Sequence, residues 1–284
     1  MKTGFESKTE QLVKGAIDFH VHAAPDGFRP RALDFMEAAE QARAAGYAAV
    51  TIKNHEYCTA PLALYAESKI GNIRVLGGVV LNHAVGGINP EAVEAAARQG
   101  AKIVWLPTFS AKNDPAKTPM KKGLTVFKED GGLIPGLREI LEFVRDQKMI
   151  LATGHLNYQE ISAVVDESRK VGLKKVLVNH PFRPESPGLS LEEQKSLASR
   201  GAVLEHCAFH FLRNNNPLPM EQVVRAIREV GGEHCVLCSD MGQVDHPVPV
   251  EALKRFMAGL LAAGIKQEEI AVMARENPRR LLDD

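Results

Sequence analysis

The stretch Ala16-Ile17-Asp18-Phe19-His20-Val21-His22 ends the first apolar run of the chain. In a β-strand, residues i and i+2 point to the same face, so His20 and His22 project two imidazoles from one face, about 7 Å apart. Such a pair suits neighbouring positions on one zinc, iron or nickel ion. For this motif by itself, two histidines packed by chance in a strand are the alternative.

Three later strand-like segments also end in side chains that bind metals. The segments Leu151–His155 and Val176–His180 end in histidine, and Val236–Asp240 ends in aspartate. Four such endings in one chain indicate a shared site rather than coincidence. The candidate metal ligands are therefore His20, His22, His155, His180 and Asp240.

Strand and helix patterns alternate along the whole chain. Strand-like segments are expected at 16–22, 48–53, 74–81, 102–106, 149–155, 175–180, 202–206 and 235–240. Helices are expected at 31–45, 61–70, 90–98, 137–147, 159–171, 191–199, 220–230 and 250–263, with an extra helix at 267–275 and a tail that starts at Asn277-Pro278. This alternation predicts an α/β fold with a parallel sheet. Eight units favour a (β/α)8 TIM barrel, a single domain over residues 1–284, above an open doubly wound sheet.

The barrel prediction agrees with the position of the candidate ligands. In a barrel the carboxyl ends of the strands meet at the face that holds the active site. The five ligands all lie at such ends, whereas the first, fifth, sixth and eighth strands of an open sheet would seldom converge on one point. We therefore expect one metal centre at the carboxyl face.

The composition is that of an ordinary soluble protein, with 45% hydrophobic and 25% charged residues. Lysine plus arginine equals aspartate plus glutamate, 35 each, so no net charge attracts nucleic acid or an acidic membrane surface. No run approaches the roughly 20 apolar residues of a membrane span, and the amino terminus has no apolar stretch of signal-peptide type. We expect a cytoplasmic protein whose partner is a small molecule, with no nucleic acid and no membrane.

The stretch from Pro107 to Pro135 is rich in Lys, Pro, Gly and Asp and is too long for an ordinary connection. It follows the fourth strand, so it is expected to leave from the ligand face and to act as a lid or binding loop. Five lysines would attract an anionic substrate: Lys112, Lys117, Lys121, Lys122 and Lys128. The alternatives are a variable surface excursion or a subunit contact in a homo-oligomer.

At these residues the chain resembles the amidohydrolase superfamily, the metal-dependent (β/α)8 hydrolases. The resemblance spans nearly the whole length, and its most specific parts are Asp18-Phe19-His20-Val21-His22, Gly154-His155, Asn179-His180-Pro181, Ser239-Asp240 and the tail 276–282. It implies that His20 and His22 bind a divalent metal. It also implies that His155 and His180 complete one or two metal sites or contact the substrate, and that Asp240 ligates the metal while taking a proton from its bound water.

The chemistry agrees with this resemblance. A divalent metal lowers the pKa of bound water from about 15.7 towards about 7, and a nearby carboxylate can accept the proton and pass it to the leaving group. Asp240 and His180 are the catalytic candidates. The cofactor expected is one or two divalent transition metal ions, zinc first, with manganese or iron as alternatives.

One departure from the superfamily pattern concerns the number of metals. Two-metal members usually carry a carboxylated lysine or a glutamate at the end of the fourth strand, whereas this strand ends Val104-Trp105-Leu106-Pro107-Thr108. Lys53 and Glu56 could substitute for that group. A single metal is favoured, as in the branch of decarboxylases and lactone hydrolases, where His180 would be a catalytic base instead of a ligand.

Other polar side chains are expected around the same mouth and are candidates for substrate binding: Lys53, His55, His83, Arg183 and His206. Arg183, just beyond His180, could hold a substrate carboxylate through two parallel hydrogen bonds.

Three functions compete at this point. The first is metal-dependent hydrolysis of a C–N or C–O bond in a small anionic substrate. The second is metal-dependent, non-oxidative decarboxylation, which the missing bridge favours. The third is a non-catalytic metal-binding barrel. The presence of Asp240 argues against it, because a protein without catalytic activity has no need of this base.

Overall fold

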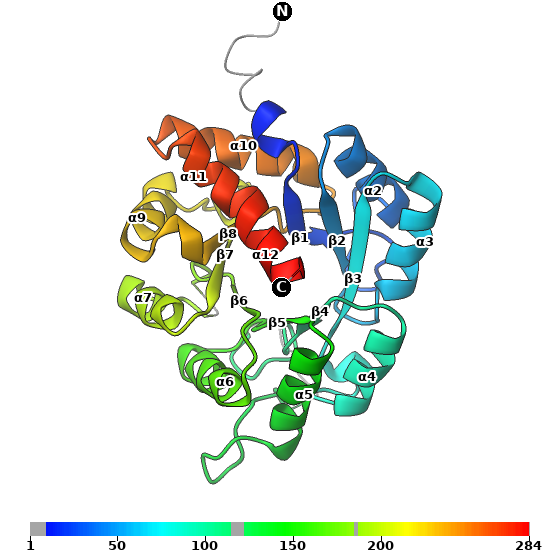
Figure 1. Ribbon diagram of the computed structural model, residues 1–284, viewed down its shortest axis with the longest axis vertical. Coiled ribbons are helices and arrows are strands. Elements are labelled where there is room, and N and C mark those ends of the chain that lie inside the picture. Colours follow the sequence, from blue (N-terminus) through cyan, green and yellow to red (C-terminus); the bar gives the residue numbers. More distant parts are fainter. Residues whose placement is uncertain (1–9, 115–121, 185–186, 284) are drawn as a thin grey trace, which may run out of the picture. The chain divides into compact units, whose positions relative to one another are not determined.

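The computed structural model describes residues 10–114, 122–184 and 187–283. Eight strands form one sheet in chain order, and every pairing whose register is known is parallel (Figure 1). The strands are β1 (Ile17–His22), β2 (Ala49–Lys53), β3 (Arg74–Val80), β4 (Ile103–Trp105), β5 (Ile150–Ala152), β6 (Val176–Asn179), β7 (Val203–Cys207) and β8 (Cys235–Cys238). The chain has the predicted (β/α)8 TIM-barrel fold.

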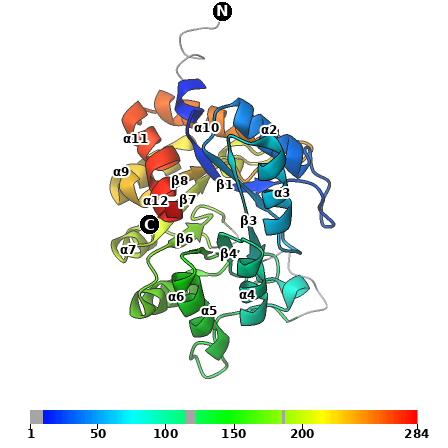
Figure 2. The ribbon, with the colours of Figure 1, turned by 45° about the vertical axis from the view of Figure 1, so that its right-hand side comes forward.

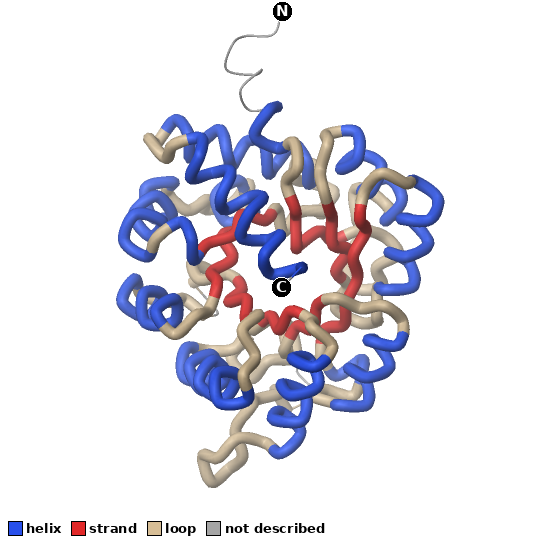
Figure 3. Tube along the Cα trace, viewed as in Figure 1, coloured by secondary structure: helices blue, strands red, loops and turns tan. Residues whose placement is uncertain are grey.

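Helices alternate with these strands along the trace, as the blue and red segments of Figure 3 show. The α-helices are α2 (Phe35–Ala44), α3 (Ala60–Ile70), α4 (Pro90–Arg98), α5 (Pro135–Asp146), α6 (Tyr158–Val171), α7 (Leu191–Ser199), α8 (Phe209–Leu212), α9 (Met220–Val230), α10 (Pro249–Ala262), α11 (Gln267–Ala271) and α12 (Asn277–Asp283). Short helical turns lie at η1 (His83–Val85) and η2 (Gly232–His234), and η3 (Val272–Glu276) is a π-helix. The bounds predicted for α4, α7 and α9 are confirmed.

The first predicted helix begins later than expected, and a cap explains the difference. The Asp34 carboxylate accepts from the amide of Glu37 at 2.8 Å, and the Glu37 carboxylate accepts from the amide of Asp34 at 2.9 Å. This capping box fixes the helix start at Phe35. Arg31, predicted as its first residue, instead pairs with Asp26 at 2.7 Å, and both side chains are buried.

The predicted tail is wrong, because residues 277–283 form α12. α12 continues directly from the π-helix η3, where the Asn277 amide donates to the Val272 carbonyl, so Pro278 lies within a continuous helical run. The Asn277 side-chain amide donates to the carbonyls of Cys235 at 2.7 Å and Gly232 at 2.8 Å. Since Cys235 begins β8, α12 covers the amino end of this strand, opposite to the end where Asp240 follows.

The chain divides into two compact units, which are described separately. Of the described residues, the first unit holds 10–53, 62–76 and 206–283, and the second holds 54–61, 77–114, 122–184 and 187–205. In the first unit, β8 continues against β1, since the Asp240 amide donates to the His20 carbonyl at 2.8 Å. In the second unit, α4, α5 and α6 lie side by side along β4 to β6 (Figure 2). The expectation of a single domain stays a prediction.

Among the described residues, no helix combines the length and the apolar character that crossing a membrane requires.

Candidate active site

One candidate cluster is built where β1 and β8 meet. The register between β1 and β2 shifts between Asp18 and Val21, and such irregularities re-aim side chains. Asp18 Oδ1 accepts from the amides of His20 at 3.0 Å and Ser239 at 3.1 Å, which ties the two strands together. Burial raises the pKa of this carboxyl to about 6. Asp18 therefore anchors the backbone beneath the two histidines.

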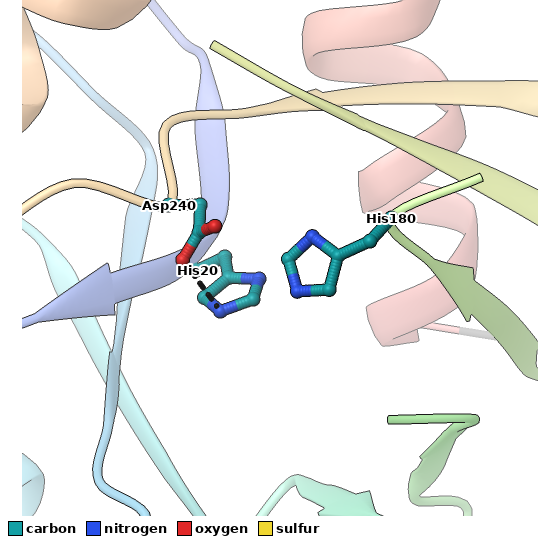
Figure 4. A group of neighbouring side chains, drawn as sticks. All are labelled: His20, His180 and Asp240. Atoms are coloured by element: carbon teal, nitrogen blue, oxygen red, sulfur yellow. Dashed lines mark ion pairs between the residues drawn. The ribbon is translucent and has the colours of Figure 1, made fainter. Parts of the chain in front are cut away.

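His20, His22 and Asp240 converge on one point. Asp240 Oδ1 lies 3.1 Å from His20 Nε2 and 3.2 Å from His22 Nε2, and the two ring centroids are 5.1 Å apart. Figure 4 shows the Asp240 carboxylate beside His20, with a dashed line for their ion pair, and also draws His180. All three ligands predicted in this unit are buried, and the structure brings them together.

The donor set of this cluster fits a divalent transition metal. Burial lowers the pKa of His22 to about 3, so its imidazole is neutral, the form that binds metals. His20 Nε2 lies 3.1 Å from Asp240 Oδ1 and 2.9 Å from Lys53 Nζ. Because a neutral ring nitrogen either donates or accepts a hydrogen bond, it cannot do both toward these two groups. Two imidazole nitrogens and a carboxylate oxygen that converge on one point form a set of ligands typical of zinc or iron sites.

Lys53, predicted as a substrate contact, lies inside this cluster. Its side chain is buried at the end of β2, and its Nζ is the partner of His20.

The backbone at Asp240 is held in an uncommon conformation. Its φ is 53°, in the left-handed region that non-glycine residues seldom adopt outside turns and functional sites. Two residues later, Gly242 has φ 141°, and a Cβ there would lie 1.8 Å from the carbonyl oxygen of His22. The segment after β8 therefore approaches β1 so closely that only glycine fits.

The second unit holds a buried cluster around His155. Its Nδ1 lies 2.6 Å from Asp114 Oδ2, and Arg183 Nη1 donates to the same oxygen at 2.9 Å. Arg183 Nη1 also lies 2.7 Å from His155 Nδ1, so this ring nitrogen faces both a carboxylate oxygen and a guanidinium N–H. Metal-binding histidines are commonly oriented by a carboxylate in this way. Arg183, predicted as a substrate clamp, uses Nη1 to hold Asp114.

His180 follows β6 beside His155, with ring centroids 5.3 Å apart, and its φ of 52° is again left-handed. The preceding Asn179 accepts from the amide of Gly154 at 2.8 Å and donates to the Glu205 carboxylate. A Cβ on Gly154 would lie 2.2 Å from the Leu106 carbonyl oxygen. The Gly154-His155 and Asn179-His180 pairs thus lock the ends of β5 and β6 to their neighbours.

His55 belongs to the same unit and has a defined environment. Its Nδ1 lies 2.9 Å from Thr108 Oγ1, and its ring packs on Phe109 at 4.2 Å between centroids. The His155 ring is 6.5 Å away, so these two predicted site residues share one neighbourhood.

The remaining predicted contacts lie in other settings. The His83 ring is half-buried in η1, and its Nε2 lies 3.0 Å from the Lys122 carbonyl oxygen. His206 is buried in β7, where strand alternation directs it to the face opposite Glu205 and Cys207.

The long loop after β4 supplies part of the site. Thr108, Ala111, Asp114 and Val126 are buried, and the Thr125 hydroxyl donates to Glu160 at 2.5 Å. Lys112, Lys122 and Lys128 lie in its described parts, whereas Lys117 and Lys121 lie outside the described residues. The lid role stays a prediction.

Sequence reasoning missed the residues that orient the histidines. Asp114 and Thr108 lie in a stretch without periodicity, so no pattern indicates which of its polar side chains turns inward. Asp18 was visible in the motif, but its role in joining β1 to β8 depends on Ser239, 221 positions away.

The comparison with protein families matches residues 15–205 to a family of unknown function, DUF6282. The chain belongs to this family. The search of curated proteins gives no match.

Solved structures similar to this DUF6282 protein share its fold over nearly the whole chain. An amidohydrolase from Pseudomonas aeruginosa is 16% identical, with 98% of each chain covered and a TM-score of 0.65. A probable dipeptidase from the same organism is 12% identical, with 99% of this chain and 98% of that chain covered and a TM-score of 0.68. A 2,6-dihydroxybenzoate decarboxylase from Rhizobium is 13% identical, with 95% and 98% covered and a TM-score of 0.58. The resemblance to the amidohydrolase superfamily is confirmed at the level of the fold.

Proposed function

We propose that the protein is a metal-dependent hydrolase that acts on a C–N or C–O bond of a small anionic substrate. The observation that carries this proposal is the convergence of His20 Nε2 and His22 Nε2 on one oxygen of Asp240. These three atoms would hold a divalent transition metal, zinc first, with manganese or iron as alternatives. The similarity to an amidohydrolase and a dipeptidase supports the same class of reaction.

The second unit holds two further candidate ligands. In a (β/α)8 barrel the carboxyl ends of all strands share one face, and His155 and His180 both follow such ends. We propose that they serve as further ligands or, for His180, as a proton-transfer group. Asp114 supports the ligand role of His155, because a carboxylate at Nδ1 orients the ring in the way common for metal-binding histidines.

A bound divalent cation would supply Lewis acidity, which polarises a substrate oxygen and acidifies water. The chain itself supplies the proton acceptor, the Asp240 carboxylate, one oxygen of which faces both imidazoles. Because His22 is neutral, the Asp240 carboxylate has no imidazolium cation from this residue beside it. Lys53 adds positive charge that would attract an anionic substrate.

A second candidate is metal-dependent, non-oxidative decarboxylation. It is favoured by the end of β4, where Trp105-Leu106-Pro107-Thr108 offers no acidic or lysine side chain to bridge two ions. The similarity to a decarboxylase supports it as well.

The balanced charge of the chain supports a small-molecule partner rather than nucleic acid or a membrane surface. We also propose a cytoplasmic location. A homo-oligomer in which the loop 107–135 forms a subunit contact is the alternative to a lid.

Metal analysis of the purified protein tests the proposal. Wild type should retain close to one equivalent of metal, and His20→Ala combined with His22→Ala should lose it while the circular dichroism spectrum stays unchanged. His246→Ala is the matched control, because this histidine lies beside the exposed Asp245. Stoichiometric metal in the double variant would overturn the assignment.

Screening amides, lactones, phosphoesters and carboxylic acids with the metal restored then identifies the reaction. Release of carbon dioxide from an acid would select the decarboxylase, and turnover of an amide or lactone would select the hydrolase.

A further inference from the structure

We propose that His55 donates a hydrogen bond from Nε2 to a substrate oxygen that gains negative charge in the reaction, and that Asn82 and Thr108 are positioning residues that fix the tautomer needed for this. The role in turnover rests on the proposed function. The tautomer follows from a chain of hydrogen bonds within the second unit.

The first step is the orientation of the Asn82 side chain. Its Oδ1 accepts from the backbone amides of Thr108 at 2.9 Å and Ser110 at 3.2 Å. Turning the amide over would place its NH2 group against two N–H groups, so the orientation is determined. The Nδ2 group therefore faces the other way and donates to the His55 carbonyl at 3.1 Å and to Thr108 Oγ1 at 2.8 Å.

The second step is the hydroxyl proton of Thr108. This hydroxyl is buried, and it already accepts from Asn82. Among the described residues, the other hydrogen-bond partner of Thr108 Oγ1 is His55 Nδ1, at 2.9 Å. A buried hydroxyl proton needs an acceptor, and His55 Nδ1 is the one within reach, so the Thr108 hydroxyl donates to it.

The third step concerns the ring itself. A neutral imidazole that accepts at Nδ1 carries its proton at Nε2. His55 therefore presents an N–H donor at Nε2.

The surroundings make the donor rigid. Phe109 packs against the ring at 4.2 Å between centroids, and the His55 side chain is buried. A donor that is held in place before the reaction stabilises developing charge without reorganisation. The acceptor that fits it is a carbonyl or carboxylate oxygen of the substrate.

Nitrogen-15 NMR of histidine-labelled protein tests the tautomer without any need for activity. The His55 signals, identified by their loss in His55→Gln, should show the proton on Nε2 in wild type. Thr108→Val has nearly the same shape but no hydroxyl proton, and should shift the ring towards the other tautomer. Thr108→Ser keeps the hydroxyl and should behave as wild type. A proton on Nδ1 in wild type would overturn the inference, whatever the metal analysis gives.

Steady-state kinetics test the donor role. His55→Leu should lower kcat by about 100-fold or more, the usual cost of losing one such donor, with a smaller change in KM. His55→Gln, whose side-chain N–H can take the place of Nε2–H, should recover most of the loss. Thr108→Val should cost about 10- to 100-fold, as expected for a group that orients another. Equal losses in His55→Gln and His55→Leu, with metal content unchanged, would exclude donation.

If no substrate is found, inorganic phosphate serves as the oxygen-anion probe. We expect the His55 Nε2–H resonance of wild type to move as phosphate is added. A resonance that stays fixed at saturating phosphate would overturn the donor role, whereas a missing metal would overturn the proposed hydrolase alone.

Discussion

Replacing Asp114 with asparagine should destabilise the fold through two buried contacts at once. Asp114 is fully buried, and its Oδ2 lies 2.6 Å from His155 Nδ1 and accepts from Arg183 Nη1 at 2.9 Å. The amide has the same size, but it has no charge and offers a single acceptor oxygen. Arg183 then keeps its charge in a site where its side chain is 16% exposed.

The contact energies set the expected size of the effect. A hydrogen bond to a charged group contributes about 1.5–3 kcal/mol, and breaking a buried ion pair costs about 3–5 kcal/mol. Because Arg183 retains some water contact, we expect about 3 kcal/mol for Asp114→Asn and about 2 kcal/mol for Arg183→Met. The double variant should cost about 1–2 kcal/mol less than the sum, since removing one partner already loses the shared contact.

Urea unfolding of the metal-free proteins measures these free energies, with the slope of each transition checked for constancy. Arg138→Met is the control, because Arg138 pairs with Glu167 while its side chain is 59% exposed, and such pairs contribute about 1 kcal/mol or less. Strict additivity of Asp114→Asn and Arg183→Met, or a loss below about 1 kcal/mol for Asp114→Asn, would refute the reasoning.

Three further predictions concern the first unit. Asp240→Asn should lower turnover at least about 100-fold, with a smaller loss of metal; near-normal turnover in the fully loaded variant would exclude proton transfer. His22 has its pKa lowered from 6.5 to about 3 by burial, so the unfolded chain binds a proton that the folded one does not. His22 should therefore contribute a loss of about 2 kcal/mol of stability to the metal-free protein between pH 6.5 and 5, which Asp18, with its pKa raised to about 6, offsets in part because it gains a proton in the folded state over the same range. In urea titrations, His22→Asn should retain more stability than wild type as the pH falls; the same pH dependence in both proteins would contradict this. Gly242→Ala should cost more than about 3 kcal/mol and reduce metal content, whereas Gly201→Ala, with φ 93° and no atom within 4 Å of the added Cβ, should cost about 1 kcal/mol; similar losses in urea unfolding would rule out the close approach to His22.

The fold could be predicted from the sequence because its signals are periodic and local. Alternating apolar runs marked each strand, and helix ends such as Asn89-Pro90 and Ser190 carry caps that can be recognised without a structure. The His20 and His22 pair was accessible for the same reason, since strand alternation alone places both on one face. Their convergence on Asp240 follows the placement of strand ends in a parallel barrel.

The parts that could not be predicted depend on contacts between distant segments. Asp114 meets His155 across 41 positions and Arg183 across 69, and it lies in a loop where neighbouring lysines and prolines give no period. Nothing in the sequence indicates that the Thr108 hydroxyl donates a hydrogen bond to His55. The helix α12 was mistaken for a tail because Asn277-Pro278 reads locally as a stop, and its contact with Cys235 is visible only in three dimensions.

The left-handed backbone of Asp240 and His180 has a consequence for efforts to stabilise this protein. Both residues have a φ near 52°. This conformation costs a non-glycine residue about 1–3 kcal/mol, whereas glycine adopts it freely. Selection for heat resistance alone would therefore reward glycine at the two positions where the candidate site needs a carboxylate and an imidazole. A library of variants that is selected for stability must keep both residues unchanged. Otherwise the selection will enrich well-folded barrels that have lost the carboxylate and the imidazole of the candidate site.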